Sequence, residues 1–439
     1  MSDKTMNRWI VAVGAILIQL CLGAIYAWSV FTPSLVDEAG DFQFTKVQTQ
    51  IIFSAGLAVF AITTVIAGRI MPKFGPRRTA MLGGTILGAG YILAGLVGTS
   101  FYSQLVLIGI VGGAGIGLGY VVPIAVGIKW FPDKKGLISG LGVAGFGFGA
   151  TLWVKMGEPM IAEYGVMNVF LYYGIIFFCL VFIGSLAMVN PPEGYAVAGA
   201  QAASRKQSRS TLGQSEYLHD EMLKTRQFWT IWIIFMFGAL AGLMVIGNIK
   251  LFGISSLQDA GMSESEASVA AGTAMAFYAI ANGIGRIAWG TASDKLGRPR
   301  SILLMSLIQG IMMLLLLRLG TNVGTFTIAA IIIGFNFGGN FALFPTITAD
   351  YFGSKSVGKN YGYTFTSYGV GGIVGPILGG MAATSDWGYS MAFIPAGVMC
   401  LIGACLALSL TQPFKKPAPE GTDHIVGKWL ETAGFPPRE

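Results

Sequence analysis

One arginine, Arg286, stands inside an otherwise apolar stretch of the sequence. Near the centre of a bilayer such a charge is costly unless it faces a cavity or a partner. Tyr278 and Asn282 precede it by two turns and one turn of a helix, so the three side chains share one face. A guanidinium on a polar stripe of this kind can bind one carboxylate through two parallel hydrogen bonds. The pattern favours an anion-binding arginine over one that extends to the membrane surface or bonds backbone carbonyls.

The composition indicates that this arginine belongs to a membrane protein. The chain has 439 residues, of which 54% are hydrophobic and 11% are charged, whereas soluble domains carry about 25% charged residues. The four cysteines fall in apolar segments and show no metal or disulfide spacing, so no metal and no cofactor is expected. Since about 20 apolar residues cross a bilayer, we count twelve spans. They lie near 9–31, 49–71, 79–98, 103–128, 137–160, 166–189, 228–252, 267–292, 301–319, 324–349, 360–383 and 388–411.

The spans fall into two groups of six that resemble each other. A first group at 1–189 is separated by a polar linker at 190–227 from a second group at 228–411, and a tail follows at 412–439. The stretch that begins at Gly68 has a counterpart that begins at Gly290. The sequence therefore predicts an all-α membrane protein with 12 transmembrane helices in two pseudo-symmetric six-helix bundles. Repeats of this kind bind their ligand at the repeat interface near the midplane, which favours transport.

The positions of the charges predict the orientation. Most lysines and arginines fall in the segments on one side, which predicts a multi-pass protein of the cell (inner) membrane with both termini cytoplasmic. The net charge of +7 then reflects topology, and a nucleic-acid partner is not expected.

The repeated turn carries a recognisable pattern. Gly290 opens a glycine-x-x-x-aspartate-basic-x-glycine-arginine sequence whose remaining members are Asp294, Lys295, Gly297 and Arg298. This turn resembles the signature loop of the major facilitator superfamily, which implies a role in gating. The first-half copy keeps Gly68, Lys73 and Gly75 but has Pro72 where the aspartate is expected, so a charge-based gate is in doubt there.

Four further segments resemble the oxalate/formate antiporter branch of that superfamily, which is related to the monocarboxylate transporters. They are 130–140, 221–229, 341–345 and 360–362. In both families the arginine that corresponds to Arg286 anchors the anion. The antiporter pattern has a lysine where this chain has Tyr368. With one cation near the midplane a dicarboxylate would leave a buried charge unpaired, so a monocarboxylate that accepts a hydrogen bond from Tyr368 fits better.

Other candidate contacts are single polar or aromatic side chains. Tyr26 and Tyr120 match aromatic positions of the antiporter branch, and Asn340 lies on a polar face of the tenth span. Tyr361 shares a helix face with Tyr368. Each of these side chains can equally serve helix packing.

These features predict a secondary active transporter of a small monocarboxylate of the lactate or pyruvate type, coupled to protons. Monocarboxylate transporters have an aspartate at the position of Asn282, and no acid lies in the central part of any span, so no residue is assigned to carry the proton. The alternatives are an oxalate/formate-type anion antiporter and a membrane substrate sensor without transport. An enzyme is not expected. An intramembrane enzyme would need a catalytic group such as a serine–histidine pair inside the spans, and both histidines, His219 and His424, lie in polar segments.

Overall fold

The computed structural model describes residues 6–31, 34–35, 40, 42–192, 195, 216–382 and 385–413, and within these ranges the regular structure is helical. The elements of the first half are α1 (Arg8–Leu22), the 3-10 helix η1 (Gly23–Val30), α3 (Lys46–Phe74), α4 (Pro76–Val97), α5 (Phe101–Gln104), the π-helix η2 (Leu105–Gly112), α6 (Gly113–Trp130) and α7 (Lys135–Leu186). Those of the second half are α9 (His219–Met222), α10 (Arg226–Asp259), α11 (Glu264–Leu296), α12 (Arg298–Leu319), α13 (Val323–Phe352), α14 (Val357–Ala382) and α15 (Ser390–Ala407).

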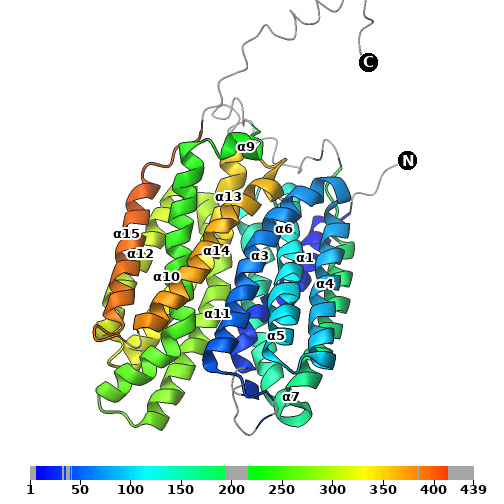
Figure 1. The fold of residues 1–439 in the computed structure, drawn as a ribbon. Helices are drawn as coiled ribbons and strands as arrows, with labels where there is room; N and C mark the ends of the chain where they lie inside the picture. The colour runs from blue at the N-terminus through cyan, green and yellow to red at the C-terminus, as the bar shows by residue number, and fades with distance from the viewer. Residues whose placement is uncertain are drawn as a thin grey trace, which may run out of the picture.

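The helices have the length and composition of membrane spans. In the described ranges, 11 helices are long and apolar enough to cross a bilayer. The predicted spans at 137–160 and 166–189 are the two parts of α7, which breaks at Gly165 with a φ of 77°. The predicted span at 360–383 is α14, which has 26 residues but is not one of the 11, because glycines and polar side chains lower its apolar content. Figure 1 shows α14 running alongside the other long helices.

Two glycines form the matching turns of the repeated pattern. Gly75 has a φ of 80° between α3 and α4, and Gly297 has a φ of 87° between α11 and α12. A side chain is disfavoured at these angles, which explains why both copies of the pattern place glycine there. In each half a proline follows in the first turn of the next helix, where its missing N–H is not needed.

The two halves meet mainly along two pairs of helices, α7 with α11 and α3 with α14. Figure 1 shows α3 and α14 side by side. We call the end of the molecule that carries α9 and the turns at Gly75 and Gly297 the linker end. Backbones approach very closely there: a Cβ placed on Gly136 would lie 2.1 Å from the carbonyl oxygen of Gly290. Similarly, a Cβ on Gly68 would lie 2.5 Å from the carbonyl oxygen of Gly358. The halves are therefore closed against each other at the linker end.

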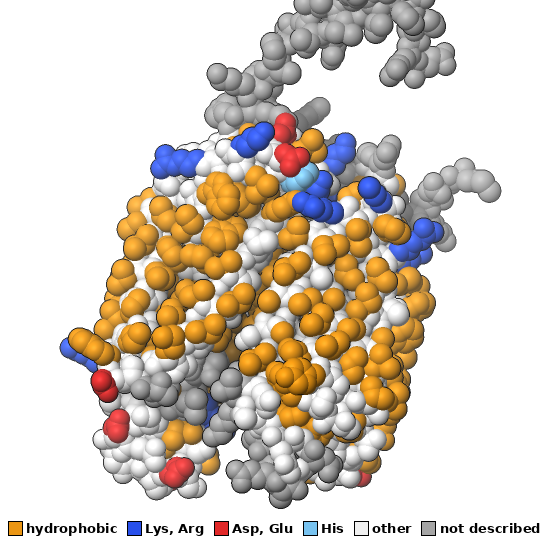
Figure 2. All heavy atoms as spheres, viewed as in Figure 1, with side chains coloured by type: hydrophobic (Ala, Val, Ile, Leu, Met, Phe, Trp, Pro, Cys, Tyr) orange, Lys and Arg blue, Asp and Glu red, His pale blue; other side chains and the backbone are white. Residues whose placement is uncertain are grey.

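The surface fits a lipid environment. Figure 2 shows hydrophobic side chains covering the flank, with the charged side chains of this face gathered towards its two ends. Large apolar side chains on the flank are strongly exposed, for example Ile62 at 60% and Ile328 at 57%. A soluble protein would bury such a continuous apolar surface, so the chain is a multi-pass membrane protein.

Candidate substrate site and gate

Arg286 lies in α11 where the two halves meet, and its side chain is 0% exposed. Its Nε donates to Oδ1 of Asn282 at 2.9 Å, one turn earlier, as the spacing predicts. Its Nη1 donates at 2.8 Å to the carbonyl oxygen of Val143 in α7, which belongs to the other half. Nη2 is buried and has no hydrogen-bond partner among the described residues. The arginine thus ties the halves together and keeps one nitrogen available for a ligand.

Two phenylalanines hold the guanidinium from opposite halves. Its central carbon lies 4.1 Å from the ring centre of Phe341 in α13 and 5.5 Å from that of Phe146 in α7. Cation–π contacts stabilise a desolvated guanidinium, and the rings exclude water from its sides. A single charge can therefore stay buried here before a ligand neutralises it.

Five tyrosines lie within electrostatic reach of this charge: Tyr26 from η1, Tyr120 from α6, Tyr278 from α11, and Tyr361 and Tyr368 from α14. The hydroxyls of Tyr26 and Tyr368 hydrogen-bond to each other across the interface. The hydroxyls of Tyr120 and Tyr361 are buried and pair with each other across the two halves, and one O–H of such a pair stays free to donate. A buried polar group without a partner costs about 1–3 kcal/mol. Arg286 Nη2 is an unused buried donor of this kind, and with the tyrosine hydroxyls beside it the site suits an anion.

The charge at the site is a lone positive one. Of the described side chains, those that act on the Arg286 charge are tyrosines, with neither a carboxylate nor a second cation among them. The described residues also contain no group of histidine, cysteine and acidic side chains that could hold a metal ion. An anionic ligand of charge −1 would balance the site.

Two of the predicted substrate contacts, Tyr278 and Asn340, hydrogen-bond to backbone carbonyls of the second half. The Tyr278 hydroxyl donates to the carbonyl oxygen of Gly242 in α10 at 3.1 Å. The Asn340 amide donates to the carbonyl oxygen of Phe337 at 3.1 Å, and its Oδ1 faces Gly238 of α10. The structure therefore brings Arg286 together with Asn282, Tyr26, Tyr120 and Tyr368. Tyr278 also lies within electrostatic reach of Arg286, but its hydroxyl is bonded to α10, and the Asn340 amide is bonded within α13.

Sequence reasoning missed three groups of the site. Phe341 stands in one of the segments that carry the resemblance, and Phe146 lies in a glycine-rich helix, but nothing in either pattern distinguishes these rings from packing residues. The carbonyl of Val143 has no sequence signal, because any residue supplies a carbonyl. Only the way α7 crosses α11 selects it.

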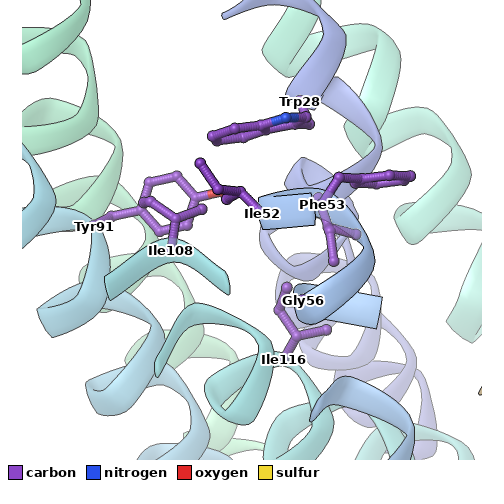
Figure 3. A pocket seen from close by; sticks show the side chains of 8 residues that line it. Trp28, Ile52, Phe53, Gly56, Tyr91, Ile108 and Ile116 are labelled. Carbon is purple, nitrogen blue, oxygen red and sulfur yellow. The ribbon is translucent and has the colours of Figure 1, made fainter. Parts of the chain in front are cut away.

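A small cavity lies inside the first half, away from Arg286. Figure 3 shows side chains from η1, α3, α4, η2 and α6 around it. Its volume is about 10 Å³, which is near the minimum for one water molecule. The lining is Ile25, Trp28, Ile52, Phe53, Gly56, Tyr91, Ile108 and Ile116. A space so small and apolar is a packing void and does not suit a carboxylate.

Asp294 closes the linker end between α11 and α7. Its carboxylate accepts the backbone N–H groups of Gly136 at 2.9 Å and Leu137 at 3.0 Å. These are N–H groups of the first turn of α7, where the helix dipole favours a negative charge. Arg298 pairs with the same carboxylate at 2.7 Å. The predicted gating aspartate therefore caps a helix of the opposite half.

A second acid, which the sequence did not reveal, extends this network. Asp350 in α13 accepts from Arg298 Nε at 2.8 Å and from Lys135 Nζ of α7 at 2.9 Å. Lys135 follows the predicted fourth span, 103–128, and Asp350 follows the predicted tenth span, 324–349, so the two charges stand at corresponding ends of the repeated halves. Lys295 is exposed at this end, and Gly297 supplies the turn.

The corresponding contact of the first half, where Pro72 replaces the aspartate, joins α3 to α14 through an arginine and a tyrosine. Arg69 of α3 hydrogen-bonds to the hydroxyl of Tyr363 in α14 and lies 5.3 Å from its ring centre. His219 of α9 stacks on the same ring, with the centroids 5.4 Å apart. The pKa of His219 is lowered by partial burial and by the positive charges of Lys359 and Arg69, while Asp220 opposes the shift. Gly68 provides the close approach of α3 to α14, and Lys73 is exposed.

The fold and the site together define a class: a helical membrane protein with two repeated halves, a buried ligand-binding charge between them and a closed gate at one end. Such an arrangement is that of a secondary transporter and not of an enzyme.

The comparison with known proteins names the family. The profile of the Major Facilitator Superfamily matches residues 17–270 and 252–435, and the chain belongs to this superfamily. It is 29% identical to the oxalate:formate antiporter of Oxalobacter formigenes, covering 94% of this chain and 93% of the relative. It is 24% identical to monocarboxylate transporter 13 of Rattus norvegicus, covering 92% and 89%. The crystal structure of the transporter FucP in the outward conformation matches with a TM-score of 0.68 at 16% identity, covering 93% of this chain and 100% of FucP.

Proposed function

We propose that this transporter carries a small monocarboxylate of the lactate or pyruvate type and that Arg286 anchors the carboxylate. The observation that carries the proposal is the fully buried guanidinium with Nη2 unused, beside the buried hydroxyls of Tyr120 and Tyr361. One substrate oxygen accepts from Nη2 and the other from a tyrosine hydroxyl. The phenylalanine rings on either side exclude water and limit the site to a small organic anion.

The single positive charge favours a monoanion over a dianion. A second carboxylate in this site would meet tyrosine hydroxyls instead of a cation, and burying an unpaired charge costs several kcal/mol. Tyr368, which stands at the position of the antiporter lysine, offers a hydroxyl that is bonded to the Tyr26 hydroxyl and brings no charge.

Transport follows from alternate opening of the two ends. With the linker end on the cytoplasmic side, as the lysine and arginine distribution indicates, the closed gate leaves the site to be reached from outside. Rocking of the halves then separates Asp294 from α7 and Lys135 from Asp350, and it breaks the bond from Arg286 to Val143. A substrate carboxylate replaces the Val143 carbonyl as the partner of Arg286. The loaded carrier can then open towards the cytoplasm without leaving the guanidinium of Arg286 unpaired.

We also propose that a proton accompanies the substrate. The charges that surround Arg286 among the described side chains include no acid. The proton therefore crosses on the substrate carboxylate or on a group that the sequence does not single out.

Uptake of labelled lactate into proteoliposomes tests the proposal. Wild type should take up lactate faster when the outside is more acidic, and Arg286→Gln should lose nearly all uptake because the anion loses its counter-charge. Substantial uptake by Arg286→Gln would refute the anchor, and a rate that ignores the pH gradient would refute proton symport.

The second candidate is an oxalate/formate-type antiporter, favoured by the 29% identity over 418 residues to a protein of that name. Oxalate-loaded proteoliposomes separate the two functions. Strong oxalate exchange without lactate uptake would establish the antiporter and exclude the monocarboxylate carrier. Substrate binding without uptake of either anion would instead identify a membrane sensor.

A further inference from the structure

A groove on the outer flank of the second half is not used by transport. It lies between the start of α10 and the last turns of α15, which are neighbours in the fold (Figure 1). Its volume is about 380 Å³. The lining residues are Arg226, Val398, Leu401, Ile402, Cys405, Leu406 and Ser409.

The groove has an apolar floor that runs along one face of α15. Its residues recur at intervals of three and four, which places them on a single stripe of the helix. Val398 is 44% exposed and Ile402 is 47% exposed. From Val398 to Leu406 the helix rises about 12 Å, which is most of the roughly 15 Å that one leaflet of hydrocarbon occupies. The floor is therefore as long as the buried part of one leaflet.

The mouth of the groove is polar and positive. Arg226, in the first turn of α10, is exposed, and the structure records no ion pair or hydrogen bond for its guanidinium within the described ranges. Ser409 stands beside it, with its hydroxyl donated to the carbonyl oxygen of Leu406 at 2.8 Å. Trp229, one turn into α10, is 50% exposed, and tryptophan is enriched at the level of lipid headgroups. The mouth therefore lies at the depth where headgroups meet hydrocarbon.

We propose that this groove binds one anionic phospholipid from the leaflet at the linker end. Its phosphate pairs with Arg226, and one acyl chain lies along Val398, Ile402 and Leu406. Charge complementarity selects the headgroup, because a guanidinium attracts a lipid with net negative charge more than one whose own ammonium neutralises the phosphate. The lipid would hold α15 against α10 at the edge of the second bundle.

Native mass spectrometry of the full-length protein released from detergent tests this assignment. The protein is equilibrated with phosphatidylglycerol or with phosphatidylcholine of the same acyl chains. Wild type should retain one phosphatidylglycerol about fivefold more strongly than phosphatidylcholine. Arg226→Gln should remove that preference, and Ile402→Trp, which fills the floor, should lower the retention of both lipids.

Arg78→Gln is the matched control, because Arg78 is also an exposed arginine in the first turn of a span, α4, and does not line the groove. It should retain the lipid as wild type does. Equal retention by Arg226→Gln and wild type would overturn the proposal, as would an equal loss in Arg78→Gln. Equal lipid retention by Arg226→Gln and wild type is also the result expected if residues 414–439 of this chain occupy the groove in place of a lipid.

Discussion

At the scale of single residues, the site is defined by what its polar groups lack. Asn282 and Val143 each accept one bond from Arg286, while its Nη2 remains without a partner in the described structure. The hydroxyls of Tyr120 and Tyr361 beside it pair with each other. Protein interiors rarely leave buried polar groups unpaired. An unused guanidinium nitrogen beside two tyrosine hydroxyls indicates where a ligand's oxygen atoms belong.

The hydroxyls of Tyr120 and Tyr361 should therefore contribute to substrate affinity. We expect Tyr120→Phe and Tyr361→Phe each to raise the KM for lactate about tenfold, the effect of losing one hydrogen bond to a charged group. Initial rates of uptake over a range of lactate concentrations measure this change. Tyr278→Phe is the control, because that hydroxyl donates to the Gly242 carbonyl in α10. If all three variants keep the wild-type KM, the tyrosines do not contact the substrate.

The sequence predicted the charged centre of this site better than its walls. Arg286 and Asn282 share a helix face by spacing alone, so their hydrogen bond could be foreseen. The rings of Phe146 and Phe341 come from α7 and α13, and their approach depends on how three helices cross. Local spacing carries no information about such crossings, and a phenylalanine in a span looks the same whether it packs against lipid or against a guanidinium.

At the scale of elements, closure between α7 and α11 depends on glycines that have no side chain to separate the backbones. A Cβ on Gly136 would lie 2.1 Å from the Gly290 carbonyl oxygen and 2.7 Å from an Asp294 carboxylate oxygen. Both distances are shorter than any real Cβ contact, so the helices would have to move apart. The gate that the repeated turn predicts thus requires the backbone contact as well as the charges.

We expect Gly136→Ala to shift the carrier about tenfold away from the state that is closed at the linker end, since overpacking costs about 1–3 kcal/mol. Spin labels on cysteines at Lys73 and Lys295, exposed at that end in opposite halves, measure the separation by electron paramagnetic resonance. The exposed Cys179 and Cys405 are first replaced by serine.

Gly142→Ala is the matched control, because a Cβ at this position of the same helix meets nothing within 4 Å. Its distance distribution should equal that of the parent protein. An unchanged distribution in Gly136→Ala would show that the glycine contact does not control the gate.

The contact between α9, α3 and α14 should respond to pH. The pKa of His219 is lowered by burial and by Lys359 and Arg69, so the closed arrangement favours the neutral imidazole. A depressed pKa means that the contact is fully stable above the usual histidine value of about 6.5 and weakens as the pH falls below it. Protonation would add a third positive charge beside Arg69 and Lys359, opposed only in part by Asp220.

We expect the same spin labels to report a larger population open at the linker end at about pH 5.5 than at about pH 7.5. His219→Gln should reduce this pH dependence, whereas replacing the second histidine, His424, should preserve it. If His219→Gln responds to pH as the parent protein does, another group controls the change.

At the scale of the whole molecule, the all-α membrane fold and its repeat could be read from the sequence because each depends on local patterns. Runs of about 20 apolar residues give the spans, and the glycine turns at Gly75 and Gly297 repeat in both sequence and backbone angle. The helical order of α9 at the end of the predicted linker could not be foreseen, because it packs on α14 through the stacking of His219 on Tyr363. A polar segment that is ordered only by such contacts has no pattern of its own.

The charge balance of the whole carrier leads to the last prediction. One buried cation between the halves, with no second cation among the described side chains around it, is neutralised by a single carboxylate, and the proposed proton cancels the charge of that carboxylate overall. Lactate uptake should then be electroneutral: a potassium diffusion potential set with valinomycin should leave the initial rate unchanged, while a pH gradient should raise it. Arg286→Gln gives the background rate in both assays. A rate that rises with a potential positive inside would mean that net negative charge enters with the substrate, and proton symport with one proton per carboxylate would be wrong.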